Sequence, residues 1–189
     1  KLNARDAKRN KAKILEYNKV KKAEIINNEW VISLQDGKKI KSKVLINASG
    51  PWINDTLNKN IKIKSKNKIR LVKGSHIITK KLYKEDVAFT FQNTDKRIIF
   101  VIPYKKHFSL IGTTEVEVKS PENNGISNQE IQYLIKSVNN YLKKQISKKD
   151  IVDTYSGIRP LIEDFKEASK VTRDYVFDLH IVKKLPLLN

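Results

Sequence analysis

The sequence predicts an α+β fold in two parts, a small meander followed by a larger antiparallel sheet with one long helix. In residues 20–43, apolar and polar side chains alternate around Asp36-Gly37, a hairpin turn that accepts positive φ at low cost. Residues 69–112 hold four strand candidates in succession without a helix between them, and an amphipathic helix follows at residues 127–142. Successive strands of this kind indicate antiparallel pairing.

The composition is strongly basic. The 189 residues include 39 Lys and Arg against 20 Asp and Glu, which gives a formal net charge of +19. Such a charge is typical of proteins that bind nucleic acid or an anionic membrane surface. The lysines are spread along the whole chain without a basic patch that interleaves aromatic side chains, so the sequence predicts no nucleic-acid partner. The absence of Cys excludes disulfides and Cys-ligated metal in this chain, and three dispersed histidines predict no metal site.

The sequence also bears on location. No apolar run reaches the length of a membrane span, and the first residues lack the apolar centre of a signal peptide, so a cytoplasmic protein is expected. Because the chain begins without Met and stops in an apolar stretch at residues 185–189, we expect it to be a piece of a longer protein.

The first part contains signals for a helix, a meander and one buried strand. Residues 2–10 are polar and contain alanine, which favours a helix, and residues 12–17 offer a short strand. Residues 20–26 and 30–34 alternate well enough for two further strands. Residues 44–48 form an apolar run interrupted only by Asn47, as in a strand that is covered on both faces.

A turn of small residues follows this buried strand. It comprises Asn47, Ala48, Ser49 and Gly50, and Pro51 then opens a short helix over residues 52–57. Small residues at the end of a strand let a ligand or a neighbouring backbone approach closely, and a helix N-terminus favours an anion. The alternative is an ordinary tight turn between a strand and a helix.

In the second part, the expected strands span residues 69–78, 87–91, 97–104 and 108–112. Ser127 and Glu130 have the spacing of a capping box at the start of the helix. One apolar stripe at helical spacing should face the core: Ile131, Leu134, Ile135, Val138, Tyr141 and Leu142.

Two strands are expected after the helix. The first covers residues 152–158, breaks at Gly157 with Arg159 at the break, and stops at Pro160, which cannot continue a ladder. The second covers residues 171–179.

His76, Arg159 and Arg173 are the candidate site residues, because one sheet could present all three to the same cavity. Two guanidinium groups suit a phosphate or carboxylate, and a histidine beside them is disfavoured in its protonated form, which suits a base. The alternatives are structural. Arg159 could pair with an acid, and His76 could satisfy a buried carbonyl. The acids within reach in the sequence are Glu163, Asp164 and Glu167.

Six motifs together resemble, in order and spacing, the middle of the FAD-dependent, quinone-reducing (aerobic) glycerol-3-phosphate dehydrogenases. The resemblance covers nearly the whole chain. The motifs lie at residues 44–52, 69–76, 92–97, 111–115, 155–161 and 172–175.

The resemblance implies a fold and an activity. Residues 1–60 would be part of a glutathione-reductase-like FAD domain, residues 61–179 a substrate domain of the D-amino-acid-oxidase type, and residues 180–189 the return to the FAD domain. The implied reaction oxidises sn-glycerol 3-phosphate to dihydroxyacetone phosphate and passes electrons through FAD to a membrane quinone. A peripheral position on the inner face of the membrane and a homodimer are also compatible with it.

The resemblance also assigns roles to residues. His76 would be the base for the C2 hydroxyl, and Arg159 and Arg173 would bind the phosphate or the hydroxyl end of the substrate. Val20 falls on the strand that contacts adenine. The residues that would lie against FAD are Asn47, Ala48, Ser49, Gly50 and Trp52.

The chain departs from the family in two places. The Gly-x-Gly-x-x-Gly motif that cradles the FAD pyrophosphate is absent, and so is the Gly-Gly-Lys segment that contacts the flavin. We therefore expect that the chain alone neither holds FAD tightly nor turns over. Two alternatives stay open: a related flavin oxidase acting on another small substrate, and a non-catalytic remnant or basic binding module.

Overall fold

The computed structural model describes residues 1–65, 67–122, 124–163 and 176–189. They form two compact units. The first unit comprises Lys1–Ser49, Ile53–Ser65 and the described part of Tyr175–Asn189. The second comprises Gly50–Trp52 and the described part of Lys66–Asp174.

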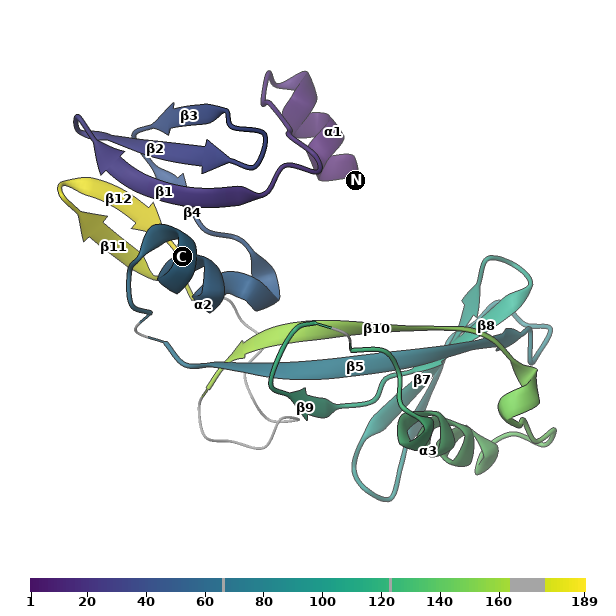
Figure 1. Cartoon of the computed structure of the whole chain (residues 1–189). Helices are drawn as coiled ribbons and strands as arrows, with labels where there is room; N and C mark the ends of the chain where they lie inside the picture. The colour runs from purple at the N-terminus through teal and green to yellow at the C-terminus, as the bar shows by residue number, and fades with distance from the viewer. Residues whose placement is uncertain (66, 123, 164–175) are drawn as a thin grey trace. The chain divides into compact units, whose positions relative to one another are not determined.

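The first unit begins with a helix and a meander (Figure 1). Its elements are α1 Leu2–Arg9, β1 Val20–Ile26, β2 Glu29–Leu34 and β3 Lys39–Ser42. The three strands pair antiparallel in the order β1-β2-β3, which confirms the predicted meander. The strand expected at residues 12–17 is wrong. Lys11 and Tyr17 have φ of 67° and 57°, left-handed values that interrupt an extended strand.

The predicted buried strand is shorter and more exposed than expected. Only β4, Leu45–Ile46, is formed, and it pairs parallel with β12, Leu185–Leu188, which pairs antiparallel with β11, Leu179–Val182. Ile46 is 63% exposed because no described element covers the face that carries it. The expectation that both faces are covered is therefore wrong for the described residues.

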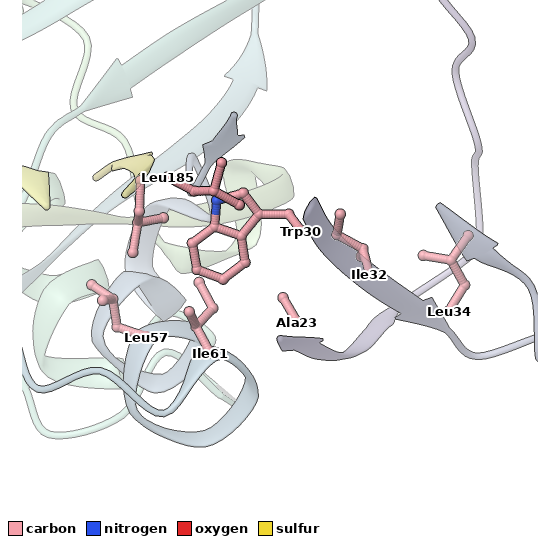
Figure 2. Packing of buried hydrophobic residues seen from close by; sticks show 8 residues of the cluster. Ala23, Trp30, Ile32, Leu34, Leu57, Ile61 and Leu185 are labelled. Atoms are coloured by element: carbon pink, nitrogen blue, oxygen red, sulfur yellow. The ribbon is translucent and has the colours of Figure 1, made fainter. Parts of the chain in front are cut away.

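The core of the first unit is built around Trp30. Its side chain is 1% exposed, and its indole Nε1 donates a hydrogen bond to the carbonyl of Pro186 at 3.1 Å, which ties β2 to β12. Figure 2 shows Leu57, Ile61 and Leu185 around the indole. Leu57 and Ile61 come from the helical segment after the small-residue turn, which consists of η1 Gly50–Trp52, α2 Ile53–Asp55 and η2 Thr56–Ile61.

The second unit is an antiparallel sheet (Figure 1). Its strands are β5 Ile69–Lys80, β6 Phe89–Gln92, β7 Ile98–Tyr104, β8 Phe108–Gly112, β9 Val116–Val118 and β10 Ile151–Ile162. The order is β10-β5-β8-β7-β6, with β9 also paired to β5. The four strands predicted between residues 69 and 112 are confirmed. β9 was not predicted, since three residues are too short to show an alternation.

The helix α3, Asn128–Asn139, packs on one face of this sheet. Leu134 and Val138 join a buried cluster with residues of β5, β7 and β8, and the Ser127–Glu130 capping box is formed as predicted. The helix ends before Tyr141, which is exposed rather than part of the buried stripe. The opposite face carries His76 and Arg159.

β10 differs from its prediction. It runs through both expected breakers, because Gly157 pairs with Gly74 and Pro160 pairs with Leu71 of β5. An edge strand tolerates a proline, since every second N–H of such a strand points away from the sheet. Most of the strand expected at 171–179 lies outside the described residues. In its described part, residues 176–179, the first three residues are irregular, and β11 begins only at Leu179.

Candidate active site

The pairing of β5 with β10 gathers the candidate residues. The register joins three pairs: His76 with Tyr155, Gly74 with Gly157, and Val72 with Arg159. Directly opposed residues of an antiparallel pair share a face, and alternate residues of one strand share it too. These side chains therefore lie on the face away from α3, whereas Ile77, next to His76, belongs to the cluster under the helix.

The ring of His76 lies between an aromatic ring and bare backbone. It stacks on Tyr155 with ring centroids 4.7 Å apart and planes 10° from parallel. On its other side, β8 pairs Gly112 with His76, and a Cβ added to Gly112 would overlap the imidazole. The half-buried ring is thus held in one plane, and only glycine fits at position 112.

The guanidinium of Arg159 lies over Gly74. A Cβ built on Gly74 would be 2.8 Å from Nη1 and 3.1 Å from Nη2 of Arg159, and 2.6 Å from Oγ1 of Thr113. A Cβ on Gly157, the partner of Gly74, would meet nothing within 4 Å. The two glycines form a floor without side chains, and the guanidinium covers one half of it while the other half is open.

Two buried nitrogens of this face lack a partner. Within the described part of the chain, neither Nη1 of Arg159 nor Nδ1 of His76 has a hydrogen-bond partner, although both are shielded from solvent. Leaving such groups unpaired is costly, and an anionic ligand would satisfy the guanidinium.

The electrostatics favour a neutral imidazole. Burial lowers the pKa of His76 below its ordinary value of 6.5, and the positive charge of Arg159 lowers it further. The ring is therefore mostly unprotonated at neutral pH and can accept a proton. Arg173, Asp164 and Glu167 lie outside the described residues.

An aromatic side chain extends this row of the sheet. Phe100 of β7 pairs with Gly112, so Tyr155, His76, Gly112 and Phe100 form one row across four strands. No role in the site was predicted for Tyr155, Gly74, Gly157 or Phe100. Because every second residue of a strand points to the same face, counting back from Arg159 in steps of two would have identified Tyr155. The cross-strand partners depend on the register of strand pairing, which one sequence does not show.

The small-residue turn is shaped by a buried amide. Asn47 donates from Nδ2 to the carbonyl of Ile53 at 3.1 Å and to Oδ1 of Asn189 at 2.7 Å, and its Oδ1 accepts from the Ser49 hydroxyl at 2.7 Å. Ala48 is exposed, and Gly50 has φ of +58° with nothing within 4 Å of an added Cβ. The turn therefore carries little side-chain bulk at Ala48 and Gly50, while the Asn47 side chain is occupied with holding the turn.

Val20 and Trp52 were the other expected cofactor contacts. The carbonyl of Val20, at the start of β1, accepts a hydrogen bond from Nδ2 of Asn60 at 3.1 Å. Trp52 donates from Nε1 to Oε1 of Glu122 at 2.7 Å, which leaves its exposed ring face for a contact. Their contacts with FAD stay predictions.

The described residues hold neither a cluster of metal ligands nor a membrane-spanning helix. No three His, Asp or Glu side chains among them gather into a group that could hold a metal ion. No described helix is both long and apolar enough to cross a membrane.

Known proteins share this sequence and fold. The family model described as DAO, FAD dependent oxidoreductase, matches residues 1–178. The chain is 40% identical to the aerobic glycerol-3-phosphate dehydrogenase of Escherichia coli K12, over 99% of this chain and 39% of that protein. It is 38% identical to the D-erythritol 1-phosphate dehydrogenase of Brucella abortus, over 100% of this chain and 39% of that protein. The chain thus spans about two fifths of the length of these relatives.

A solved structure shows the same fold. The glycerol-3-phosphate dehydrogenase from Bacillus halodurans, solved as a complex with FAD, superposes with a TM-score of 0.69. The match covers 92% of this chain and 34% of the solved chain at 22% sequence identity. It confirms the mixed α+β architecture with antiparallel sheets.

Proposed function

The chain belongs to the DAO family of FAD-dependent oxidoreductases. On that premise we propose that the sheet face away from α3, which carries His76 and Arg159 and is called the open face below, takes part in oxidising sn-glycerol 3-phosphate to dihydroxyacetone phosphate. One observation carries the proposal: a buried guanidinium nitrogen of Arg159 without a described partner, beside the neutral imidazole of His76. A phosphate monoester offers oxygens to the first group, and its secondary alcohol offers a proton to the second. The names of the relatives at about 40% identity support this substrate.

Arg159 binds the phosphate in this proposal. Its planar fork can give two parallel, charge-assisted hydrogen bonds to phosphate oxygens, which fixes orientation as well as position. The open half of the glycine floor, at Gly157, lets a small substrate lie against the backbone. Arg173 is proposed as a second cation for the same ligand.

His76 acts as the base. It takes the proton from the C2 hydroxyl as the carbonyl forms, and the stack on Tyr155 keeps the ring in the plane needed for that transfer. FAD, when bound, supplies the acceptor for the hydride that leaves C2. We assign the contacts with FAD to the turn at Asn47–Gly50, to the Trp52 ring and to the β1 backbone at Val20.

A second substrate class is favoured by one observation. The floor beyond Gly157 is open, so a longer polyol phosphate would also fit, and a relative of nearly equal identity is named for D-erythritol 1-phosphate. Both substrates share the phosphate and the neighbouring secondary alcohol. A flavin oxidase acting on an amino acid would use Arg159 for a carboxylate instead.

Ligand binding to the chain separates these classes. The imidazole signals of His76 would be followed by NMR while glycerol 3-phosphate, erythritol 1-phosphate, glycine or inorganic phosphate is added. We expect the phosphate monoesters to shift the signals and Arg159→Gln to abolish the shift, with glycine inert. A response to glycine alone, or phosphate binding that Arg159→Gln leaves intact, would overturn the proposal.

The cofactor, acceptor and place of the reaction complete the proposal. Because the sequence has no Gly-x-Gly-x-x-Gly motif, we propose that the 189 residues alone bind FAD weakly, which a fluorescence titration with FAD measures. We propose a membrane quinone as electron acceptor and peripheral contact with the inner membrane face. The charge of +19 supports contact with anionic lipid, at about 1 kcal/mol for each well-placed Lys or Arg. Co-sedimentation with anionic vesicles, but not with neutral ones, is expected.

A further inference from the structure

A buried ion pair lies behind the candidate site. Lys73 and Ser75 flank Gly74 in β5 and point to the opposite face, toward α3. Nζ of Lys73 lies 2.8 Å from Oε2 of Glu130 and also donates to the carbonyl of Gly125 at 2.9 Å. Lys73 and Glu130 are 6% and 5% exposed. Burying both charges is costly unless further hydrogen bonds compensate, so the partners of this pair matter.

The carboxylate of Glu130 accepts four bonds from four positions in the chain. Oε1 accepts from the hydroxyls of Ser75 at 2.7 Å and Thr114 at 2.8 Å. Oε2 accepts from Lys73 and from the backbone N–H of Ser127, each at 2.8 Å. Burial by itself would raise the pKa of Glu130, but the bonds from Lys73, Ser127, Ser75 and Thr114 outweigh it and lower the pKa to about 2. The group is thus ionised and fully engaged at neutral pH.

Two more bonds extend this network to the strands of the site. Oγ1 of Thr114 accepts from the backbone N–H of Ser75 at 2.9 Å. The hydroxyls of Ser75 and Ser156 lie 2.8 Å apart, and because Ser75 donates to Glu130, Ser156 is the donor between them. The network therefore reaches β10 as well as β5 and the segment after β8.

Three hydroxyl residues of the network adjoin residues of the open face. Ser75 lies between Gly74 and His76, and Thr114 follows Thr113. Ser156 lies between Tyr155 and Gly157. The three segments that carry His76, Arg159 and Thr113 are thus fastened from behind to one carboxylate.

We propose that Glu130, together with Lys73, positions the active site by fixing the spacing of β5, β10 and the Thr113–Thr114 segment, so that Arg159 and His76 meet the same ligand. None of the network residues contacts the ligand in this proposal. The ligand is the phosphate monoester of the proposed function, on which this inference rests. The environment of His76 reports on positioning without any substrate.

The competing explanation is that the network only stabilises the fold. Thr114→Val separates the two, since it keeps the side-chain shape but removes both bonds of the hydroxyl. Thr114→Ser keeps the hydroxyl and is the rescue variant. Ser127→Ala is the matched control for stability. It removes the hydroxyl that accepts from the backbone N–H of Glu130 at 3.2 Å but leaves all four donors of the carboxylate in place.

All variants would be made in the full chain and compared under conditions where denaturant curves show them folded. We expect Thr114→Val to weaken binding of glycerol 3-phosphate about tenfold or more and to move the pKa of His76 measured by NMR. Thr114→Ser should restore both, and Ser127→Ala should change neither, even where its loss of stability is similar. Equal effects of Thr114→Val and Ser127→Ala, or none from Thr114→Val, would overturn the proposal.

A second variant and a readout without substrate complete the test. If Thr114→Val does not fold, Ser156→Ala removes only the link to β10 and allows the same comparison. If glycerol 3-phosphate fails to bind even the unaltered chain, the proposed substrate is wrong. A shift of the His76 pKa in Thr114→Val would then still support positioning, and an unshifted pKa would reject it.

Discussion

The imidazole of His76 lies flat against the phenol ring of Tyr155, with planes 10° apart, while Gly112 closes its other side. A proton acceptor is useful only if its lone pair stays aimed at the donor, and this stack removes most of the freedom of the ring. Tyr155 of β10 thus orients the His76 ring. Arg159 lies two residues beyond Gly157 on the same face of β10 and contributes a positive charge.

Replacing Tyr155 tests the stack. Tyr155→Ala should weaken glycerol 3-phosphate binding roughly tenfold, because the imidazole gains rotational freedom beside the ligand. Tyr155→Phe keeps the ring and should stay near the unaltered affinity. Isothermal titration calorimetry measures both, and equal losses in the two variants would show that the hydroxyl matters rather than the stack.

The titration of His76 tests the electrostatics. Its pKa should lie below 6.5, and Arg159→Gln should raise the pKa toward that value because one of its two causes is removed. A base must be neutral before it can accept a proton, so the fraction of His76 that can act as a base should fall as the pH falls through this pKa. An unchanged His76 titration in Arg159→Gln would contradict the contact.

The floor glycines give a matched pair of substitutions. Gly74→Ala places a Cβ 2.8 Å from Nη1 of Arg159 and should displace the guanidinium, with a loss of phosphate affinity of about tenfold or more. Gly157→Ala meets open space and should leave the Arg159 geometry and inorganic phosphate binding intact. Calorimetry with phosphate compares them, and equal tolerance of both changes would place the guanidinium elsewhere.

Glu130 predicts a specific loss of stability in acid. Its folded-state pKa of about 2 lies below the ordinary 4.5, so its contribution is complete above pH 4.5 and disappears as the pH falls toward 2. The shift corresponds to about 3 kcal/mol of unfolding free energy. Urea denaturation from pH 6 downward should show this loss in the unaltered chain and a much smaller one in Glu130→Gln. Parallel pH curves would refute the assignment.

The features that sequence predicted are those with local causes. The meander follows from alternation around Asp36-Gly37, and the start of α3 follows from the spacing of Ser127 and Glu130. Gly157 and Pro160 were wrongly predicted to end the strand, because the rules for strand-breaking residues consider only the local sequence. The strand tolerates both residues because it pairs with β5 at the edge of the sheet.

The candidate site was predicted only in part for the same reason. His76 and Arg159 were identified by residue type and motif, and the structure brings them to one face. Tyr155 and the floor glycines depend on cross-strand register. The carboxylate of Glu130 was interpreted only as a helix cap, because its partner Lys73 is distant in sequence and close only in the fold.

The alternation along β5 makes this strand intolerant of insertions and deletions. Losing one residue before Lys73 would shift the pairing by one position and turn each of the following side chains to the other face. Lys73 would then occupy the floor, and Glu130 would lose its counter-ion in the same event. Family members should therefore differ from this chain by substitution, but not in length, between Val72 and His76.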